Sequence, residues 1–111
     1  MNPVYDVVRD LITDVEKTQQ ENIEAAAVAC AKAIENGGIL QAFGSGHSEA
    51  GAMEVAHRAG GFIPTKKILE PARGAYEGIE GVGTSFMKKV DIRENDVLVL
   101  ISNSGRNPLA I

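Results

Sequence analysis

Apolar residues in the first third of the chain recur every three or four positions, which is the spacing of one helix face. The series runs over residues 4–34 and is interrupted by the polar stretch 17–22. The pair Asn2-Pro3 is typical of a helix start, and Gly37-Gly38 is typical of a helix end. The pattern therefore predicts an amino-terminal helical segment over residues 1–36, as one long helix or as two helices joined by a kink.

Two later stretches follow a different pattern, in which an apolar run stops abruptly in small and hydroxyl-bearing residues. Residues 39–43 are followed by Gly44-Ser45-Gly46-His47-Ser48, which we call the first serine loop. Residues 97–101 are followed by Ser102-Asn103-Ser104-Gly105-Arg106, the second serine loop. Each pattern indicates a buried strand that ends in a loop just before a helix can begin.

The segment between the two units alternates helical and extended patterns. We predict a helix over residues 49–59, a weak strand within 62–69, a glycine-rich loop over 70–83, a short helix over 84–90 and a turn at 93–96. Lys66 and Lys67 are expected on a solvated face. Strands that alternate with helices favour an α/β fold with a parallel, doubly wound sheet.

The run 97–101 is apolar at every position, which suits a strand covered on both faces inside a parallel sheet. Only one loop and three residues follow it. We therefore expect residues 37–111 to be the first part of an α/β sandwich that continues in a longer domain.

The two serine loops predict an anion site, because loops after neighbouring parallel strands meet at the carboxyl edge of the sheet. Glycines let the backbone approach an oxyanion, hydroxyls donate to it, and helix N–H groups favour its charge. The natural occupant is a phosphorylated small molecule, and Arg73 and Arg106 are the cations expected to approach it. The candidate binding residues are Gly44, Ser45, Gly46, Ser48, Ser102, Asn103, Ser104, Gly105 and Arg106.

Composition narrows the class of protein without naming a function. A chain of 111 residues with 44% hydrophobic content is one globular domain or part of one. Its net charge of −4 gives no reason to expect nucleic acid or an anionic membrane as a partner. A single cysteine and the lack of a signal pattern make the cytoplasm the expected location.

Three common loop motifs are absent from the sequence. Glu49 stands where the dinucleotide fingerprint needs its third glycine, and neither serine loop carries the Gly-Lys-Ser/Thr of a nucleoside-triphosphate loop. Neither matches the Gly-x-Ser-x-Gly of a hydrolase nucleophile. What remains is a pair of loops with four hydroxyls that can surround one phosphate.

Together these loops resemble the sugar isomerase, or SIS, domain family, whose signature is Gly-x-Gly-x-Ser after the first strand and Ser-x-Ser-Gly after a later one. The resemblance covers essentially the whole chain. It implies a flavodoxin-like three-layer α/β/α sandwich that binds phosphosugars, usually as a homodimer or homotetramer. Within the family the chain is most similar to uncharacterised phosphosugar-binding proteins related to phosphoheptose isomerases and N-acetylmuramic acid 6-phosphate etherases.

The candidate catalytic residues are His47, Glu49 and Glu80. Isomerising a sugar phosphate needs a base next to the carbonyl carbon and an acid at its oxygen. Histidine is a common proton shuttle, which makes His47 a candidate, and Glu49 can act as a base or favour the first helical turn through the helix dipole. The etherase relatives imply a glutamate between the two loops, where Glu77 and Glu80 lie.

A metal site is not expected, and neither is any other cofactor. In phosphoheptose isomerases a histidine and a glutamate one helical turn apart bind zinc, and the matching positions here are Glu54 and Arg58. An arginine is not a zinc ligand. Glu54 and His57 share a helix face, which permits joint metal binding, but a simple charge pair is the favoured interpretation.

The leading hypothesis is a sugar-phosphate isomerase, similar to phosphoheptose isomerase, or a related lyase. A second hypothesis is a non-catalytic phosphosugar sensor, and a third is an oligomerisation module with an empty site.

Overall fold

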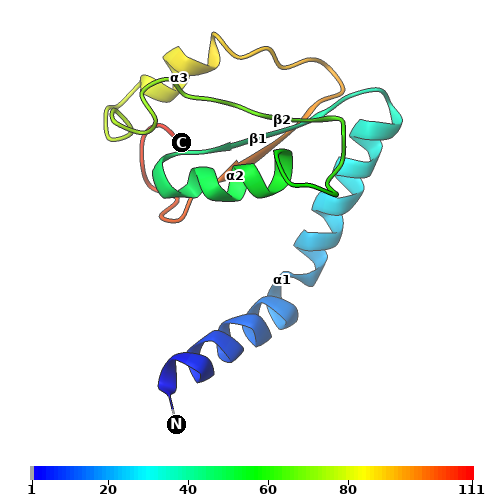
Figure 1. Ribbon diagram of the computed structural model, residues 1–111, viewed down its shortest axis with the longest axis vertical. Helices are drawn as coiled ribbons and strands as arrows, with labels where there is room; N and C mark the ends of the chain where they lie inside the picture. Colours follow the sequence, from blue (N-terminus) through cyan, green and yellow to red (C-terminus); the bar gives the residue numbers. More distant parts are fainter. Residues whose placement is uncertain (1) are drawn as a thin grey trace. The chain divides into compact units, whose positions relative to one another are not determined.

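The computed structural model describes residues 2–111 and shows a mixed α/β fold (Figure 1). In chain order the elements are α1 (Pro3–Glu35), β1 (Leu40–Gly44), the 3₁₀ turn η1 (Gly46–Ser48), α2 (Glu49–Ala56), β2 (Thr65–Lys67), α3 (Val82–Met87) and β3 (Val97–Ile101). The chain divides into two compact units, one that ends at Lys32 and one that spans Ala33–Ile111.

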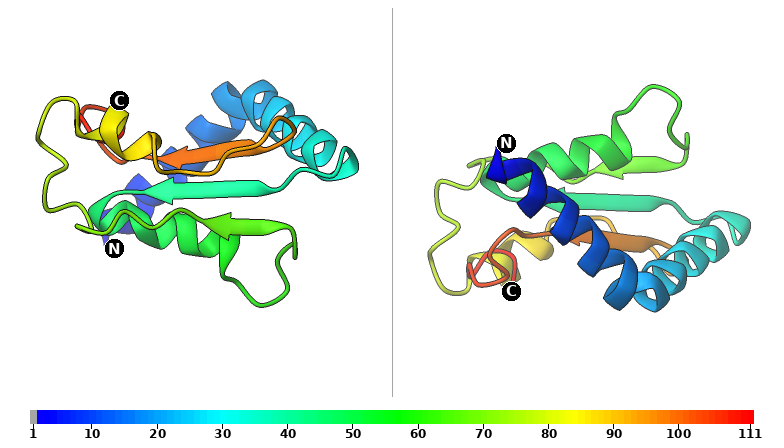
Figure 2. Two further views of the ribbon diagram at one scale, coloured as in Figure 1. Left: turned by 90° about the horizontal axis from the view of Figure 1, so that it is seen from above. Right: turned by 90° about the horizontal axis from the view of Figure 1, so that it is seen from below.

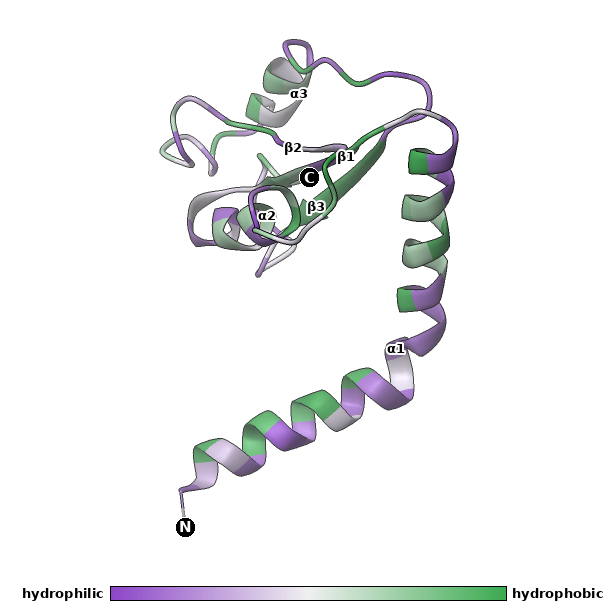
Figure 3. Ribbon diagram, turned by 45° about the vertical axis from the view of Figure 1, so that its right-hand side comes forward, coloured by the Kyte–Doolittle hydropathy of each residue, from purple (hydrophilic) through white to green (hydrophobic). Residues whose placement is uncertain are grey.

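Helix α1 is continuous but bent in its middle, as Figure 3 shows. Its first turn is capped by Asn2, whose side-chain oxygen accepts the N–H of Val4 at 3.0 Å, as predicted. Thr13 and Thr18 donate their hydroxyls to the carbonyls four residues earlier, at 2.9 and 2.7 Å. Such bonds often bend helices, and they explain the bend without a break in the helix.

The sheet has three parallel strands in the order β2-β1-β3, and Figure 2 shows the three arrows running in the same direction. In the central pair Leu40 lies opposite Val97 and Gly44 lies opposite Ile101. All five residues of β1 are buried, whereas β3 alternates between half-buried and exposed positions. Leu98 and Leu100 are exposed, so the described residues 2–111 do not cover both faces of β3.

Helices lie on both sides of the sheet, with α2 on one face and α3 on the other (Figure 1). Ala52 of α2 is fully buried, and Gly51 faces the side chain of Ile101. On the other face Phe43 and Phe86 pack with their ring centroids 5.7 Å apart. Ile68 and Leu109 complete this buried cluster.

Two predicted helices differ in their bounds from the observed ones. The helix predicted over 49–59 ends at Ala56, and its cap His57 already leaves helical geometry at φ −123°. The weak strand predicted within 62–69 is confirmed as the three residues of β2, which begins directly after Pro64. Helix α3 begins at Val82, where Gly81 adopts a left-handed conformation at the helix start.

A buried polar contact fixes the amino ends of β1 and β3. Gln41 is 1% exposed, and its amide nitrogen donates to the Asp96 carboxylate and the Asp91 carbonyl, each at 2.8 Å. Asp96 also accepts the N–H groups of Arg93 and Ile39, at 3.0 and 2.9 Å. The Arg93 N–H, then the Ile39 N–H and the Gln41 amide, lower the pKa of Asp96 below its ordinary value. The charged carboxylate thus ties the turn before β3 to the first residues of β1.

Candidate functional site: the two serine loops

The two serine loops leave the sheet at the same edge. Gly44 and Ile101, the last residues of β1 and β3, are register partners, so both loops start at one level of the sheet. The side-chain oxygen of Ser48 accepts the N–H of Asn103 at 3.3 Å and joins the loops directly. This convergence is what the sequence pattern predicted.

The first serine loop is a tight turn whose shape depends on Gly44. A Cβ atom at this position would lie 2.1 Å from the backbone oxygen of Ser48, far inside contact distance. Gly46 has a φ of 60°, and Ser48 donates its N–H to the Ser45 carbonyl at 3.1 Å. Only glycine permits the first approach, and glycine is favoured at the second.

The second serine loop is held by its own hydroxyl groups. Ser102 accepts the N–H of Gly105 at 2.9 Å, and Ser104 accepts the N–H of Arg106 at 3.2 Å. These are local side-chain turns of the kind that serine forms readily. The N–H groups expected to be free for an anion are therefore engaged with serine oxygens.

The four hydroxyls differ in what their protons can do. Ser48, Ser102 and Ser104 accept backbone N–H groups, which leaves each O–H proton free to donate to an oxyanion. Ser45 instead donates its proton to the carboxylate of Glu77, with an oxygen–oxygen distance of 2.5 Å. Three hydroxyls are thus available to a phosphate, and the fourth holds a glutamate beside the loop.

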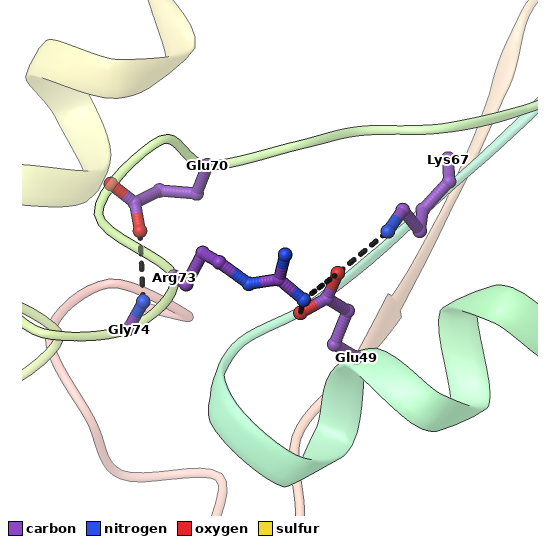
Figure 4. Close-up of polar contacts among 5 residues, drawn as sticks. All are labelled: Glu49, Lys67, Glu70, Arg73 and Gly74. Atoms are coloured by element: carbon purple, nitrogen blue, oxygen red, sulfur yellow. Dashed lines mark hydrogen bonds and ion pairs between the residues drawn. The ribbon is translucent and has the colours of Figure 1, made fainter.

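Glu49 begins α2 directly after the first loop and is bound by two cations (Figure 4). Its Oε1 accepts a hydrogen bond from Lys67 Nζ at 2.6 Å, and its Oε2 accepts one from Arg73 Nη2 at 3.1 Å. The side chains of Glu49 and Lys67 are only 15% and 12% exposed, so Lys67 does not lie on the solvated face that the sequence predicted. The Lys67 hydrogen bond, helped by the charge of Arg73, lowers the pKa of Glu49 despite partial burial.

The other two candidate catalytic residues are exposed. His47 lies in η1. Glu80 lies with Arg106 on an apolar groove of about 1050 Å³ beside α3 and β3, which Phe43, Phe86 and Leu100 also line. The lining of this groove includes none of the four serines, and Arg106 is the residue of the serine loops that contributes to it.

The possible metal pair on α2 is not assembled as a site. Glu54 pairs with Arg58 at 3.5 Å, and both side chains are about 70% exposed. The sequence favoured a charge pair of Glu54 with His57, but the observed partner of Glu54 is Arg58, one residue further along the chain. Within residues 2–111, no group of three or more His, Cys, Asp or Glu side chains is placed to hold a metal ion.

Comparison with known proteins agrees with the architecture and the loops. A family model for the SIS domain matches residues 5–111. The chain belongs to the SIS-domain family. Proteins of this family generally bind phosphosugars.

Similar proteins occur in several bacteria. A UPF0309 protein of Listeria monocytogenes is 54% identical over 107 residues, which cover 96% of this chain and 46% of that protein. A UPF0309 protein of Geobacillus thermodenitrificans is 38% identical over 116 residues (96% and 47%), and one of Streptomyces coelicolor is 34% identical over 117 residues (96% and 47%). The chain spans about half the length of these curated relatives.

The long first helix is amphipathic rather than uniformly apolar. None of the helices within residues 2–111 is both long enough and apolar enough to cross a membrane.

Proposed function

We propose that the serine loops bind the phosphate of a phosphosugar and that the protein acts on this sugar as an isomerase or a related lyase. The observation that carries the proposal is the convergence of the loops, joined by the bond between Ser48 and Asn103. Three hydroxyl protons at this edge are free to donate, which suits the several oxygens of a phosphate.

Glu77 joins His47, Glu49 and Glu80 as a candidate acid or base. Its carboxylate is half-buried and receives the Ser45 hydroxyl, so it is held at the loop that would bind the phosphate. A carboxylate in this position can accept a proton from the carbon next to a sugar carbonyl and return it to a neighbouring atom. Glu49 is less suited to that role, because two cations stabilise its charged form.

The double variant Ser102→Ala/Ser104→Ala tests the binding role in the full-length protein. Removing two hydroxyl donors to a charged phosphate should weaken sugar-phosphate binding about 100-fold or more, measured by calorimetry with hexose, heptose and N-acetylated amino-sugar phosphates. Ser85→Ala is the matched control, since Ser85 is exposed on α3 outside both loops. Unchanged affinity in the double variant would contradict the proposed phosphate-binding role of the serine loops.

The second candidate function is a phosphosugar sensor without catalysis. It is favoured by the engagement of Glu49 with Lys67 and Arg73 and by the exposed pair of Glu54 with Arg58, which leave fewer groups free for chemistry. Glu77→Gln separates the two functions. An enzyme should lose turnover and keep ligand affinity, whereas a sensor shows no product in either form.

The assembly state is part of the same proposal. We expect a homodimer or homotetramer, which light scattering on the full-length protein measures directly. If the wild type assembles but binds no sugar phosphate, the oligomerisation-module hypothesis replaces both.

A further inference from the structure

We propose that Arg73 is an oxyanion-binding residue of the first serine loop and that two carboxylates position it: Glu70 fixes its backbone and Glu49 tethers its guanidinium. This inference rests on the proposed phosphosugar site and adds a specificity-determining residue to it. It also gives Glu49 a positioning role in place of the catalytic one considered above.

The backbone at Arg73 is the first part of the argument. Arg73 has a φ of 52°, the one positive value at a non-glycine position among residues 2–111. Side chains other than glycine rarely adopt this left-handed conformation, and it persists only where surrounding contacts enforce it. Such residues cluster at functional sites.

Glu70 supplies the enforcing contacts (Figure 4). One of its carboxylate oxygens accepts the N–H of Ala72 at 3.0 Å, and the other accepts the N–H of Gly74 at 2.9 Å. The Glu70 carbonyl also accepts the N–H of Arg73 at 3.0 Å. A single glutamate therefore binds the backbone on both sides of Arg73 and holds the strained turn in one shape.

Glu49 then directs the side chain. Arg73 Nη2 lies 3.1 and 3.3 Å from the two oxygens of Glu49. No other side-chain bond of Arg73 occurs within residues 2–111, and the side chain is 67% exposed. Because an exposed ion pair adds little stability, this tether does not account for the strained backbone. The remaining N–H groups of the fork are left for a ligand, in the geometry that suits a phosphate or carboxylate.

The turn also lies against the first serine loop. A Cβ atom on Gly74 would be 3.0 Å from both the Ser45 hydroxyl oxygen and the Gly46 nitrogen, so the two backbones are in direct contact. Two carboxylates that would repel an oxyanion lie next to this loop, since Glu49 directly follows it and Glu77 accepts the Ser45 hydroxyl. A guanidinium at the same place offsets that repulsion.

Arg73→Gly is the sharpest test, because it separates a binding role from a structural one. Glycine relieves the strain at φ 52°, so the midpoint of thermal unfolding should stay the same or rise. The affinity of the full-length protein for inorganic phosphate and for glucose 6-phosphate should fall about tenfold or more. Arg58→Ala is the control, since it removes an exposed arginine from a comparable ion pair and should change neither quantity.

Unchanged affinity in Arg73→Gly overturns the inference. A lowered unfolding midpoint also overturns it, because the arginine would then be a structural residue. The proposed function survives either result if Ser102→Ala/Ser104→Ala still abolishes binding. If the wild type binds neither inorganic phosphate nor any of the hexose, heptose and N-acetylated amino-sugar phosphates, the proposed function itself fails and the inference with it.

Double-mutant cycles test the two positioning roles. Glu70→Gln and Glu49→Gln should each weaken phosphate binding in the parent protein and have no effect in the Arg73→Gly background, because their action passes through Arg73. An equal loss of affinity in both backgrounds would assign these carboxylates to the stability of the loop instead. A gain in affinity for Glu49→Gln would show that Glu49 only repels the anion.

Discussion

The two serine loops have similar sequences but are held in place by different means. The first follows a strand that is buried at every position, and its Ser45 contacts Glu77, 32 residues further along the chain. The second follows a strand with alternating exposure, and its two serines accept N–H groups two and three residues away. The first loop thus combines a tight local turn with a long-range contact, whereas the bonds within the second loop join only neighbouring residues.

We infer from this difference that the two loops have different roles at the proposed site. The hydroxyl protons of the second loop remain free to donate, which suits a loop that binds the phosphate whatever sugar carries it. Glu49, Arg73 and Glu77 lie beside the first loop, and they are the groups that we propose to distinguish one sugar phosphate from another or to act on it. We expect substitutions at the first loop to affect folding as well as binding.

Gly44→Ala should produce the largest effect, because it blocks the close backbone approach that shapes the first loop. The new methyl group would collide with the backbone of Ser48 at 2.1 Å, and neither backbone segment can move without disturbing β1 or η1. We expect the free energy of unfolding in urea to fall by roughly 3 kcal/mol or more. Gly78→Ala is the matched control, since its methyl group meets nothing within 4 Å and should change stability by about 0.5 kcal/mol at most. Equal losses in the two variants would mean that the first loop adapts as freely as an exposed turn.

Ser48→Ala should have a smaller effect that reaches both loops. It removes the acceptor for the Asn103 N–H, the one bond that joins them directly, and one of the three free hydroxyl donors. We expect stability to fall by about 1 kcal/mol and phosphate affinity to fall about tenfold. Chemical denaturation and calorimetry measure the two quantities. If affinity falls while the NMR signals of residues 102–106 stay unchanged, the bond between Ser48 and Asn103 does not couple the conformations of the two loops.

Gly46→Ala and Gly105→Ala compare the backbones of the two loops directly. The two glycines have φ values of 60° and 64°, so alanine should cost each loop a similar amount, about 1 kcal/mol. Neither new methyl group meets a close obstacle, since the nearest atom to Gly46 is Glu77 Oε2 at 3.6 Å. Matched urea titrations of the two variants measure the difference. A much larger loss at Gly46 would show that Glu77 confines the first loop more tightly than the distances indicate.

The sequence predicted the elements that local pattern determines. Apolar runs that end in glycine and serine located β3 with its correct bounds and β1 to within one residue at either end, and Asn2 and Gly37 marked the ends of α1. The side-chain turns of the second serine loop also involve only neighbouring residues. The N–H groups of Gly105 and Arg106 were nevertheless predicted to be free, and they are bound by Ser102 and Ser104.

Contacts that join distant segments were not predictable in the same way. Lys67 was predicted on a solvated face because it is a charged residue near a strand end. In the structure it forms a nearly buried ion pair with the carboxylate of Glu49, 18 residues earlier. The pairing of Ser45 with Glu77 and the turn at Arg73 fall in a glycine-rich segment without periodicity. In such a segment the backbone path is fixed by tertiary hydrogen bonds, which no local pattern records.

The smallest expected effect concerns pH and again separates the loops, because Glu49, whose pKa is lowered, directly follows the first loop. The pKa of Glu49 is lower in the folded protein, so folding favours its charged form. The stability that Glu49 contributes is therefore complete above its unfolded pKa of about 4.3 and is lost as the pH falls through the lowered folded value. Thermal unfolding midpoints between pH 6 and pH 3 should decline on acidification, and Glu49→Gln should make the decline less steep.

Asp96 provides an internal comparison for that measurement. Its pKa is also lowered, chiefly by the Arg93 N–H, so Asp96→Asn should flatten the same acidic part of the profile. Asp96 lies at the opposite end of β3 from the serine loops, so only Glu49→Gln should also change the pH dependence of phosphate binding. If both variants alter the pH dependence of phosphate binding equally, the carboxylate of Glu49 acts on binding through the stability of the sheet. The two loops would then differ in how they fold and not in the charged groups that contact the ligand.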